Sequence, residues 1–116
     1  MNKQIHAELE KIEAQGLKNV KLLALVSGTS YEVLFYADVD GKMCQSNDLA
    51  ESGIISISFV EDLYETVANV VREDKKFDAA KMNIIKASDE KVTVEYDEKK
   101  CKIYSIKKKW KEEIGI

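Results

Sequence analysis

The chain of 116 residues contains no proline, five glycines, one histidine and two cysteines. Without proline, helices and strands must end at glycines or at Asp and Asn turns. The single histidine, His6, is the only candidate base for a Ser–His or Cys–His pair, and it lies beside the apolar stripe of a predicted helix. We interpret His6 as a structural residue. The glycines are dispersed along the chain and form no phosphate-binding loop. These absences argue against two common kinds of catalytic site.

The cysteines, Cys44 and Cys101, are far apart in the sequence, and neither belongs to a Cys-x-x-Cys motif. With one histidine in the chain, no metal-ligand spacing is present, so we expect no metal site and no cofactor. The segment Met1–Glu10 is polar and acidic, unlike a secretory signal, and no apolar run approaches the ~20 residues of a membrane span. We therefore expect a cytoplasmic protein with two reduced thiols.

Composition and length predict one soluble domain over residues 1–116. Hydrophobic residues make up 45% of the chain and charged residues 34%, which is typical of a folded globular protein. The length is near the commonest size of a single domain.

The order of apolar and polar residues predicts an α+β fold. Helices are expected at Asn2–Gln15, Phe59–Glu73 and Cys101–Glu113, and strands at Val20–Ser27, Tyr31–Val39, Lys42–Ser46, Ala80–Ala87 and Lys91–Tyr96. Tight turns between strands favour antiparallel pairing. The expected architecture is an antiparallel sheet of about five strands in α-β-β-β-α-β-β-α order, with the helices packed on one face.

Residues 101–113 are compatible with a strand or a helix, and the spacing of Ile103, Ile106, Trp110 and Ile114 favours the helix. The helix Phe59–Glu73 has the Ser58–Glu61 spacing of a capping box. Its predicted buried stripe is Phe59, Leu63, Val67, Val70 and Val71, bordered by Val60 and Tyr64. Asn47–Ser58 is predicted to be a connection, in which Ile54, Ile55 and Ile57 need cover.

Charge is sorted along the chain. From Gly28 to Thr66 there are eight acidic residues and one basic residue, Lys42. From Lys99 to Lys111 there are seven lysines and no acid. An acidic surface attracts basic partners and speeds their encounter. We therefore predict a binding protein rather than an enzyme.

The lysine-rich tail around Trp110 has two interpretations. Basic residues around an aromatic ring can contact phosphates and stack a base. The helical spacing of Trp110 with isoleucines instead predicts a buried ring, with Lys107, Lys108 and Lys109 pointing mainly to water. We favour the buried ring.

Several features follow one another along the chain: an aromatic strand, Tyr31–Tyr36, an Asp40–Gly41–Lys42 turn, an amphipathic helix from Phe59, a second hairpin and the terminal run Trp110–Gly115. In this layout the chain resembles the YezG-type immunity proteins of bacteria. The resemblance covers most of the chain as a pattern of elements, whereas the basic tail departs from it. The resemblance implies an α+β fold and a cytoplasmic inhibitor that caps a cognate toxin domain, commonly a nuclease, in contact-dependent inhibition or polymorphic toxin systems.

The expected partner is therefore a basic toxin domain, and not a membrane or a nucleic acid. We predict a partner-binding surface made of acids from the acidic stretch and one aromatic anchor: Glu32, Tyr36, Asp38, Asp40, Asp48, Glu51 and Asp62. Two alternatives stay open at this point. One is a small acidic secretion chaperone that binds an effector, and the other is a nucleic-acid-binding module that uses the lysine-rich tail.

Overall fold

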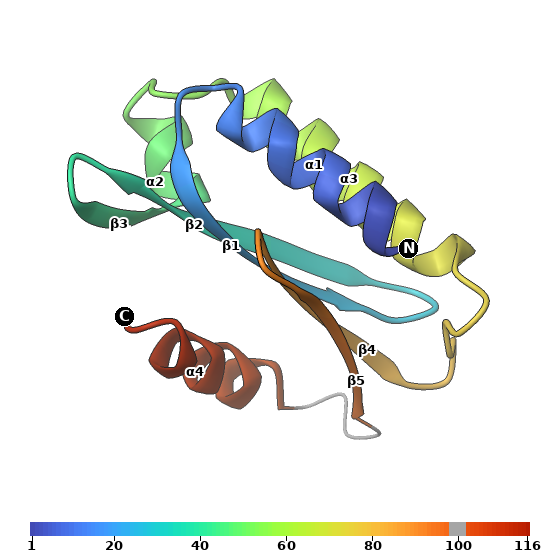
Figure 1. Cartoon of the computed structure of the whole chain (residues 1–116). Helices are drawn as coiled ribbons and strands as arrows, with labels where there is room; N and C mark the ends of the chain where they lie inside the picture. The colour runs from blue at the N-terminus through green and yellow to red at the C-terminus, as the bar shows by residue number, and fades with distance from the viewer. Residues whose placement is uncertain (98–101) are drawn as a thin grey trace.

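The computed structural model describes residues 1–97 and 102–116 (Figure 1). Its elements are α1 (Asn2–Glu13), β1 (Lys18–Val26), β2 (Tyr31–Val39), β3 (Lys42–Gln45), α2 (Ser46–Glu51), α3 (Ile57–Glu73), β4 (Met82–Ser88), β5 (Val92–Asp97) and α4 (Ile103–Glu113). The predicted α+β class, the five strands and their order are confirmed. The short helix α2 begins at Ser46, the predicted end of a strand, and occupies the first part of Asn47–Ser58, which was predicted to be a connection.

The sheet has the strand order β3-β2-β1-β4-β5, and every neighbouring pair is antiparallel. The β2–β3 hairpin turns at Asp40 and Gly41, whose φ angles are 52° and 85°. Positive φ at both central residues is what a two-residue hairpin of this hand requires. The Asp38 carboxylate reinforces the turn, because its Oδ1 accepts a hydrogen bond from the Gly41 amide at 2.7 Å.

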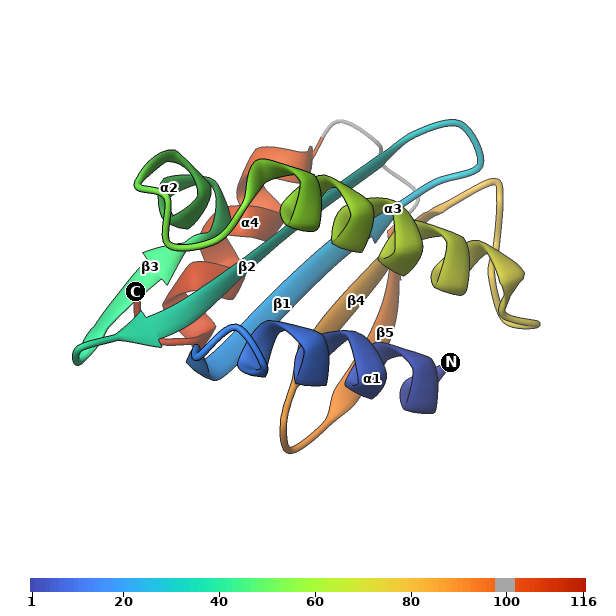
Figure 2. The same ribbon diagram turned by 90° about the horizontal axis from the view of Figure 1, so that it is seen from above.

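Both faces of the sheet are covered, so the prediction that the helices share one face is wrong. Helices α1 and α3 pack on one face and α4 on the other (Figures 1 and 2). The reason lies in the central strand β1, where all five residues from Leu22 to Val26 are buried. A strand that is apolar on both sides needs cover on both sides.

The start of α3 also differs from the prediction. The N-cap is Ser56, whose Oγ accepts from the Phe59 amide at 3.1 Å, so the Ser58–Glu61 capping box is wrong. The true cap lies two residues earlier, because the helix begins at Ile57. Its buried residues are Val60, Leu63, Val67, Ala68 and Val71, while Phe59, Tyr64 and Val70 are half-buried.

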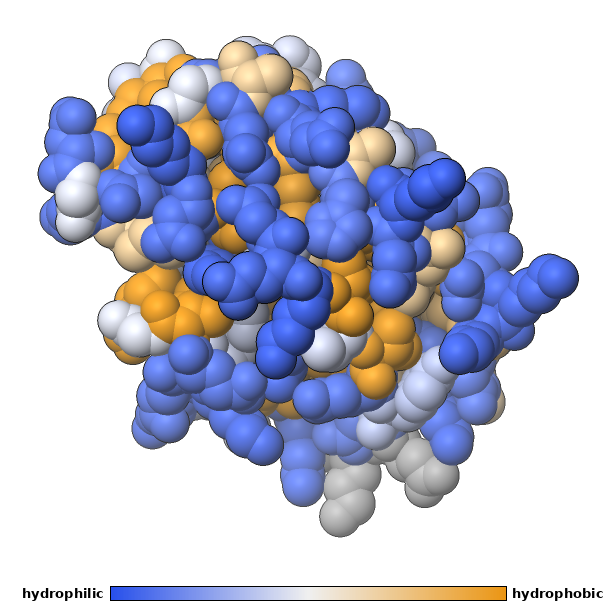
Figure 3. Space-filling model, in the orientation of Figure 1, coloured by the Kyte–Doolittle hydropathy of each residue, from blue (hydrophilic) through white to orange (hydrophobic). Residues whose placement is uncertain are grey.

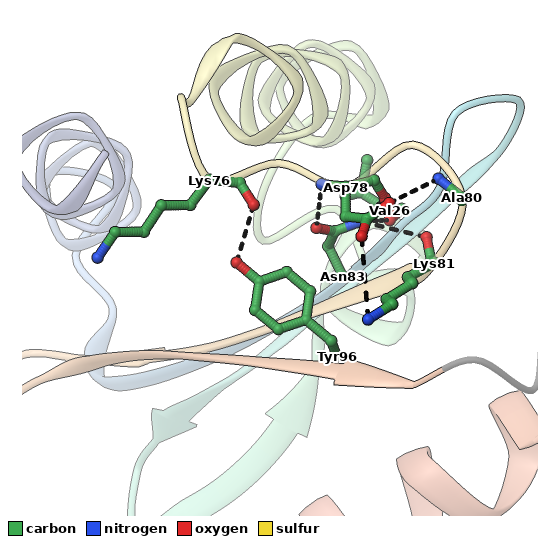
Figure 4. A network of polar contacts seen from close by, with 7 residues as sticks. All are labelled: Val26, Lys76, Asp78, Ala80, Lys81, Asn83 and Tyr96. Atoms are coloured by element: carbon green, nitrogen blue, oxygen red, sulfur yellow. Dashed lines mark hydrogen bonds and ion pairs between the residues drawn. The ribbon is translucent and has the colours of Figure 1, made fainter.

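Strand β4 begins at Met82 rather than at Ala80, because Asn83 fixes the preceding segment as a turn (Figure 4). The Asn83 side chain is 1% exposed. Its Nδ2 donates to the carbonyls of Val26, Asp78 and Lys81 at 2.8–3.2 Å, and its Oδ1 accepts from the Asp78 amide at 3.0 Å. The buried amide is thereby satisfied, and the turn is held against the end of β1.

Residues Ile103–Glu113 form a helix, which confirms the helical interpretation of the tail. Trp110 is 2% exposed, and its ring centroid lies 5.8 Å from that of Tyr36. Ile103, Ile106 and Ile114 pack on the same face of the sheet. Because the indole is buried, it is not available to stack a base. Cys101, where the helix was predicted to begin, lies outside the described residues, as do Lys99 and Lys100.

Salt bridges attach the flanks of α4 to the sheet. The Nζ atom of Lys107 lies 3.3 Å from Oε2 of Glu32, and the Nζ atom of Lys86 lies 3.0 Å from Oε1 of Glu113. Lys107 is therefore half-buried, whereas Lys108 and Lys109 are exposed as predicted. Across residues 1–97 and 102–116, no helix is both long enough and apolar enough to cross a membrane.

The carboxyl group of Glu13, at the end of α1, lies close to that of Asp89 in the β4–β5 turn. The side chain of Asp89 raises the pKa of Glu13 by hydrogen bonding and by charge repulsion, with smaller contributions from desolvation and Glu10. In the folded state Glu13 therefore keeps its proton to pH values above 4.5, its usual pKa. As the pH rises from 4.5 through the folded-state pKa, Glu13 ionises and the protein loses stability. Above that pKa the repulsion between the Glu13 and Asp89 carboxylates is fully present.

We expect Glu13→Gln to raise the melting temperature at pH 7, with the gain disappearing in acid. Thermal melts across a pH series measure this difference. The gain should shrink as salt is added, because Glu13 is fully exposed. Asp89→Asn should have the same effect, and the two substitutions together should give less than the sum. A gain that is independent of pH would contradict the assignment.

Candidate protein-binding surface

Helices α2 and α3 form an acidic surface at one end of the molecule. Between Lys42 and Arg72 the chain has five acids and no basic residue. All five side chains are exposed, and in the described part of the chain none is paired with a lysine or arginine. We call this surface the acidic corner; its acids are Asp48, Glu51, Glu61, Asp62 and Glu65.

Two isoleucines are exposed within the same corner. Ile54, in the connection between the helices, is 48% exposed, and Ile57, the first residue of α3, is 60% exposed. Both were expected to be covered, but only the intervening Ile55 is buried, at 3% exposed. An apolar group surrounded by charge resembles the central anchors of protein interfaces.

A buried hydroxyl pair fixes α2 against α3. Ser46, at the start of α2, is fully buried, and its Oγ shares a hydrogen bond with the Tyr64 hydroxyl of α3. The Phe35 amide of β2 also donates to Ser46 Oγ, at 3.3 Å. Burial raises the pKa of Tyr64, and the hydrogen bond to Ser46 partly opposes that rise. Tyr64 is therefore a neutral phenol at physiological pH, suited to bonding with Ser46.

Tyr64 also defines which side of α3 faces α2. Its hydroxyl donates to Asn47 Oδ1 at 3.4 Å. Residues three and seven positions earlier, Glu61 and Ile57, share that flank of the helix. Asp62 and Glu65 lie on the adjoining outward side. The corner is thus one surface, built by the packing of the two helices (Figure 2).

The predicted site residues fall into three places. Asp48, Glu51 and Asp62 belong to the acidic corner. Asp38 and Asp40 lie at the tip of the β2–β3 hairpin, at the same end of the molecule (Figures 1 and 2). Asp40 is exposed, whereas Asp38 is half-buried and bonded to Gly41. Lys42 beside the turn and Lys18, opposite Asp38 in the sheet, make this tip less acidic than the corner.

Glu32 and Tyr36 lie elsewhere, so they do not form one surface with the corner. Both side chains are on the face of β2 that α4 covers, because alternate residues of a strand share a face. Tyr36 is 7% exposed beneath Trp110, and Glu32 is paired with Lys107. Tyr36 belongs to the core and is not an accessible anchor. The corner instead offers Ile54 and Ile57, which the prediction did not include, together with Glu61 and Glu65. Two isoleucines in an acid-rich segment without helical or strand periodicity are the signal that points to them.

The described residues contain no group of three or more His, Cys, Asp or Glu side chains that could hold a metal ion. Cys44 is a free, half-buried thiol whose Sγ lies 3.6 Å from the Lys42 carbonyl oxygen. Cys101 lies outside the described residues, so the reduced state of that thiol stays a prediction. Comparison with models of protein families, with curated proteins and with solved structures returned no match.

Proposed function

We propose that this chain is an immunity protein that binds a basic toxin domain, likewise encoded by the producing cell, and neutralises it in the cytoplasm. The observation that supports the proposal best is the acidic corner, with two exposed isoleucines among five acids that form no ion pair with the lysines and arginines that the structure describes. Unpaired charges of one sign on a surface create a field that extends about 10 Å at 0.1 M salt. Such a field selects partners of the opposite sign and accelerates their encounter.

The geometry of the corner suits inhibition by occupation of a site. A domain that cleaves nucleic acid must hold a phosphate backbone, so its active-site surface is basic. Carboxylates at the corner would pair with those basic groups, while Ile54 and Ile57 would be buried at the centre of the contact. The inhibitor then acts by covering the active site, and no chemical step is required of it. The resemblance to YezG-type immunity proteins is consistent with this role.

Charge reversal of the corner tests the proposal. We expect the triple variant Asp48→Lys, Glu51→Lys, Asp62→Lys to lower the association rate with the toxin domain by about tenfold or more at low salt, because steering fields change on-rates by this order. Stopped-flow kinetics over a salt series measure the effect. The matched control is Lys108→Glu, Lys109→Glu, which reverses exposed charges on the opposite face of the sheet and should leave the rate nearly unchanged.

Growth rescue provides the decisive readout. The toxin domain encoded beside this chain is co-expressed with each variant, and survival is scored. Wild type and the lysine variant should protect, whereas the triple acidic variant combined with Ile57→Asp should not. If the acidic variants protect as well as wild type while the lysine variant fails, the binding face is wrong. If the wild-type chain neutralises no neighbouring toxin, the immunity function is wrong.

A further inference from the structure

Strand β5 is an edge of the sheet with an unpaired side. It pairs only with β4 in the described part of the chain. The Ser88 amide donates to the Lys91 carbonyl at 2.9 Å, so Lys91 directs its backbone groups toward β4. These directions alternate along an antiparallel strand. Val92, Val94 and Tyr96 therefore direct their backbone N–H and C=O groups away from the sheet, toward the open edge.

The same three residues line a groove. It has a volume of about 1090 Å³ and lies between the start of α1, the end of α3 and β5. Val92 and Val94 pack only partly against the core under α1, and Tyr96 is 44% exposed. Val70 of α3 contributes a further apolar wall. In Figure 3 apolar surface is visible between hydrophilic side chains at the level where β5 lies in Figure 1.

The rim of the groove carries more basic groups than acidic ones, so its net charge is positive. Lys3, Lys75 and Lys76 line it, and none of them forms an ion pair with a carboxylate in the described part of the chain. Of the two acids at the rim, Asp74 already accepts from the Lys76 amide at 3.1 Å and lies 3.7 Å from the Met1 amino group. The other, Glu73, is exposed. The start of α1 adds positive character, because its first turn contains no acid and no side chain caps it.

We propose that the open edge of β5 binds an extended acidic segment of another protein as a sixth strand. Its backbone would pair with the outward groups of Val92, Val94 and Tyr96. Every second side chain of the segment would enter the groove, apolar where it meets Val92 and Val94 and acidic where it meets Lys75 and Lys76. A strand edge supplies affinity through main-chain bonds, and the side-chain groove supplies selectivity. This site is independent of the proposed immunity function, because the acidic corner lies at the other end of α3, about 25 Å along a helix of 17 residues.

The experiment selects binders from a phage-displayed library of random linear decapeptides against the full chain. Enriched peptides should alternate apolar and acidic residues, and they should shift the amide NMR signals of Val92, Val94 and Tyr96. The variant Val94→Pro removes one outward amide without removing a bond to β4, so it should fold normally and lose at least about tenfold in peptide affinity. The control Val94→Thr keeps the amide and should bind with nearly unchanged affinity.

Two further comparisons separate edge pairing from other modes of binding. Methylation of the peptide amides that face β5 should abolish binding to the unaltered chain, which keeps the test valid if Val94→Pro is unstable. Lys75→Glu together with Lys76→Glu should weaken binding about fivefold or more. Failure to enrich any peptide, or enrichment of peptides that tolerate both Val94→Pro and amide methylation, would overturn the proposal. A concentration-dependent dimer that Val94→Pro abolishes would assign the edge to a second copy of the chain instead.

Discussion

Replacement of Trp110 by alanine is expected to lower the free energy of unfolding by about 3–5 kcal/mol, as measured by chemical denaturation. Trp110 is the buried residue of α4 that covers the second face of the sheet, over Leu23, Leu25 and Tyr36. Truncation would remove the largest apolar contact of the helix and leave a cavity that isoleucines on the same helix cannot fill. The substitution would destabilise both α4 and the sheet, because no other helix of the described residues covers this face of the sheet.

Tyr104→Ala is the matched control, since Tyr104 lies on the same helix and is 79% exposed. It should change stability by no more than about 0.5 kcal/mol. Trp110 is the only tryptophan, so fluorescence reports on it directly. Emission should be blue-shifted and poorly quenched by iodide. Red-shifted emission with full quenching would show that α4 does not dock and that the basic tail is free to bind nucleic acid.

Leu63→Ala is expected to cost about 2–5 kcal/mol of stability. Leu63 is 3% exposed and lies in the middle of α3, within the core between the helices and the sheet. Alanine at this position would leave a cavity surrounded by residues that the sheet holds in place. Asn69→Ala, at an exposed position of the same helix, is the control and should have little effect. Equal stability of the two variants would mean that the buried face of α3 is wrongly identified.

The strands and the ends of the hairpins could be predicted because local signals dominate there. Asp40–Gly41 tolerates positive φ at two successive residues, and the aromatic and β-branched residues of Tyr31–Val39 favour a strand, whose five central residues are buried in the structure. The helical tail was predicted from the spacing of Trp110 with three isoleucines. What local signals could not provide was the side of the sheet on which that helix packs. That choice depends on β1, whose apolar run from Leu22 to Val26 does not say which element will cover each face.

The candidate site was predictable in part for a related reason. Clustering of acids in the sequence becomes clustering in space only where consecutive elements face the same way. Helix packing brings Asp48, Glu51 and Asp62 together, whereas strand alternation turns Glu32 and Tyr36 to the opposite face, under α4. The exposure of Ile54 and Ile57 depends on where α2 ends and α3 begins. No periodic pattern marks those boundaries, because α2 is only six residues long.

The position of α4 in the chain has a consequence for folding. All five strands precede it, so the sheet can form and be covered on one face by α1 and α3 before α4 docks. During that interval Leu25, Leu34 and Ile84 present an apolar surface to the solvent, and such surfaces promote aggregation. Ribosome stalling or proteolysis just before Ile103 would leave a product in the same condition. Folding without aggregation therefore depends on α4 reaching the sheet quickly, and the attraction between Lys107 of α4 and Glu32 of β2 would speed that step.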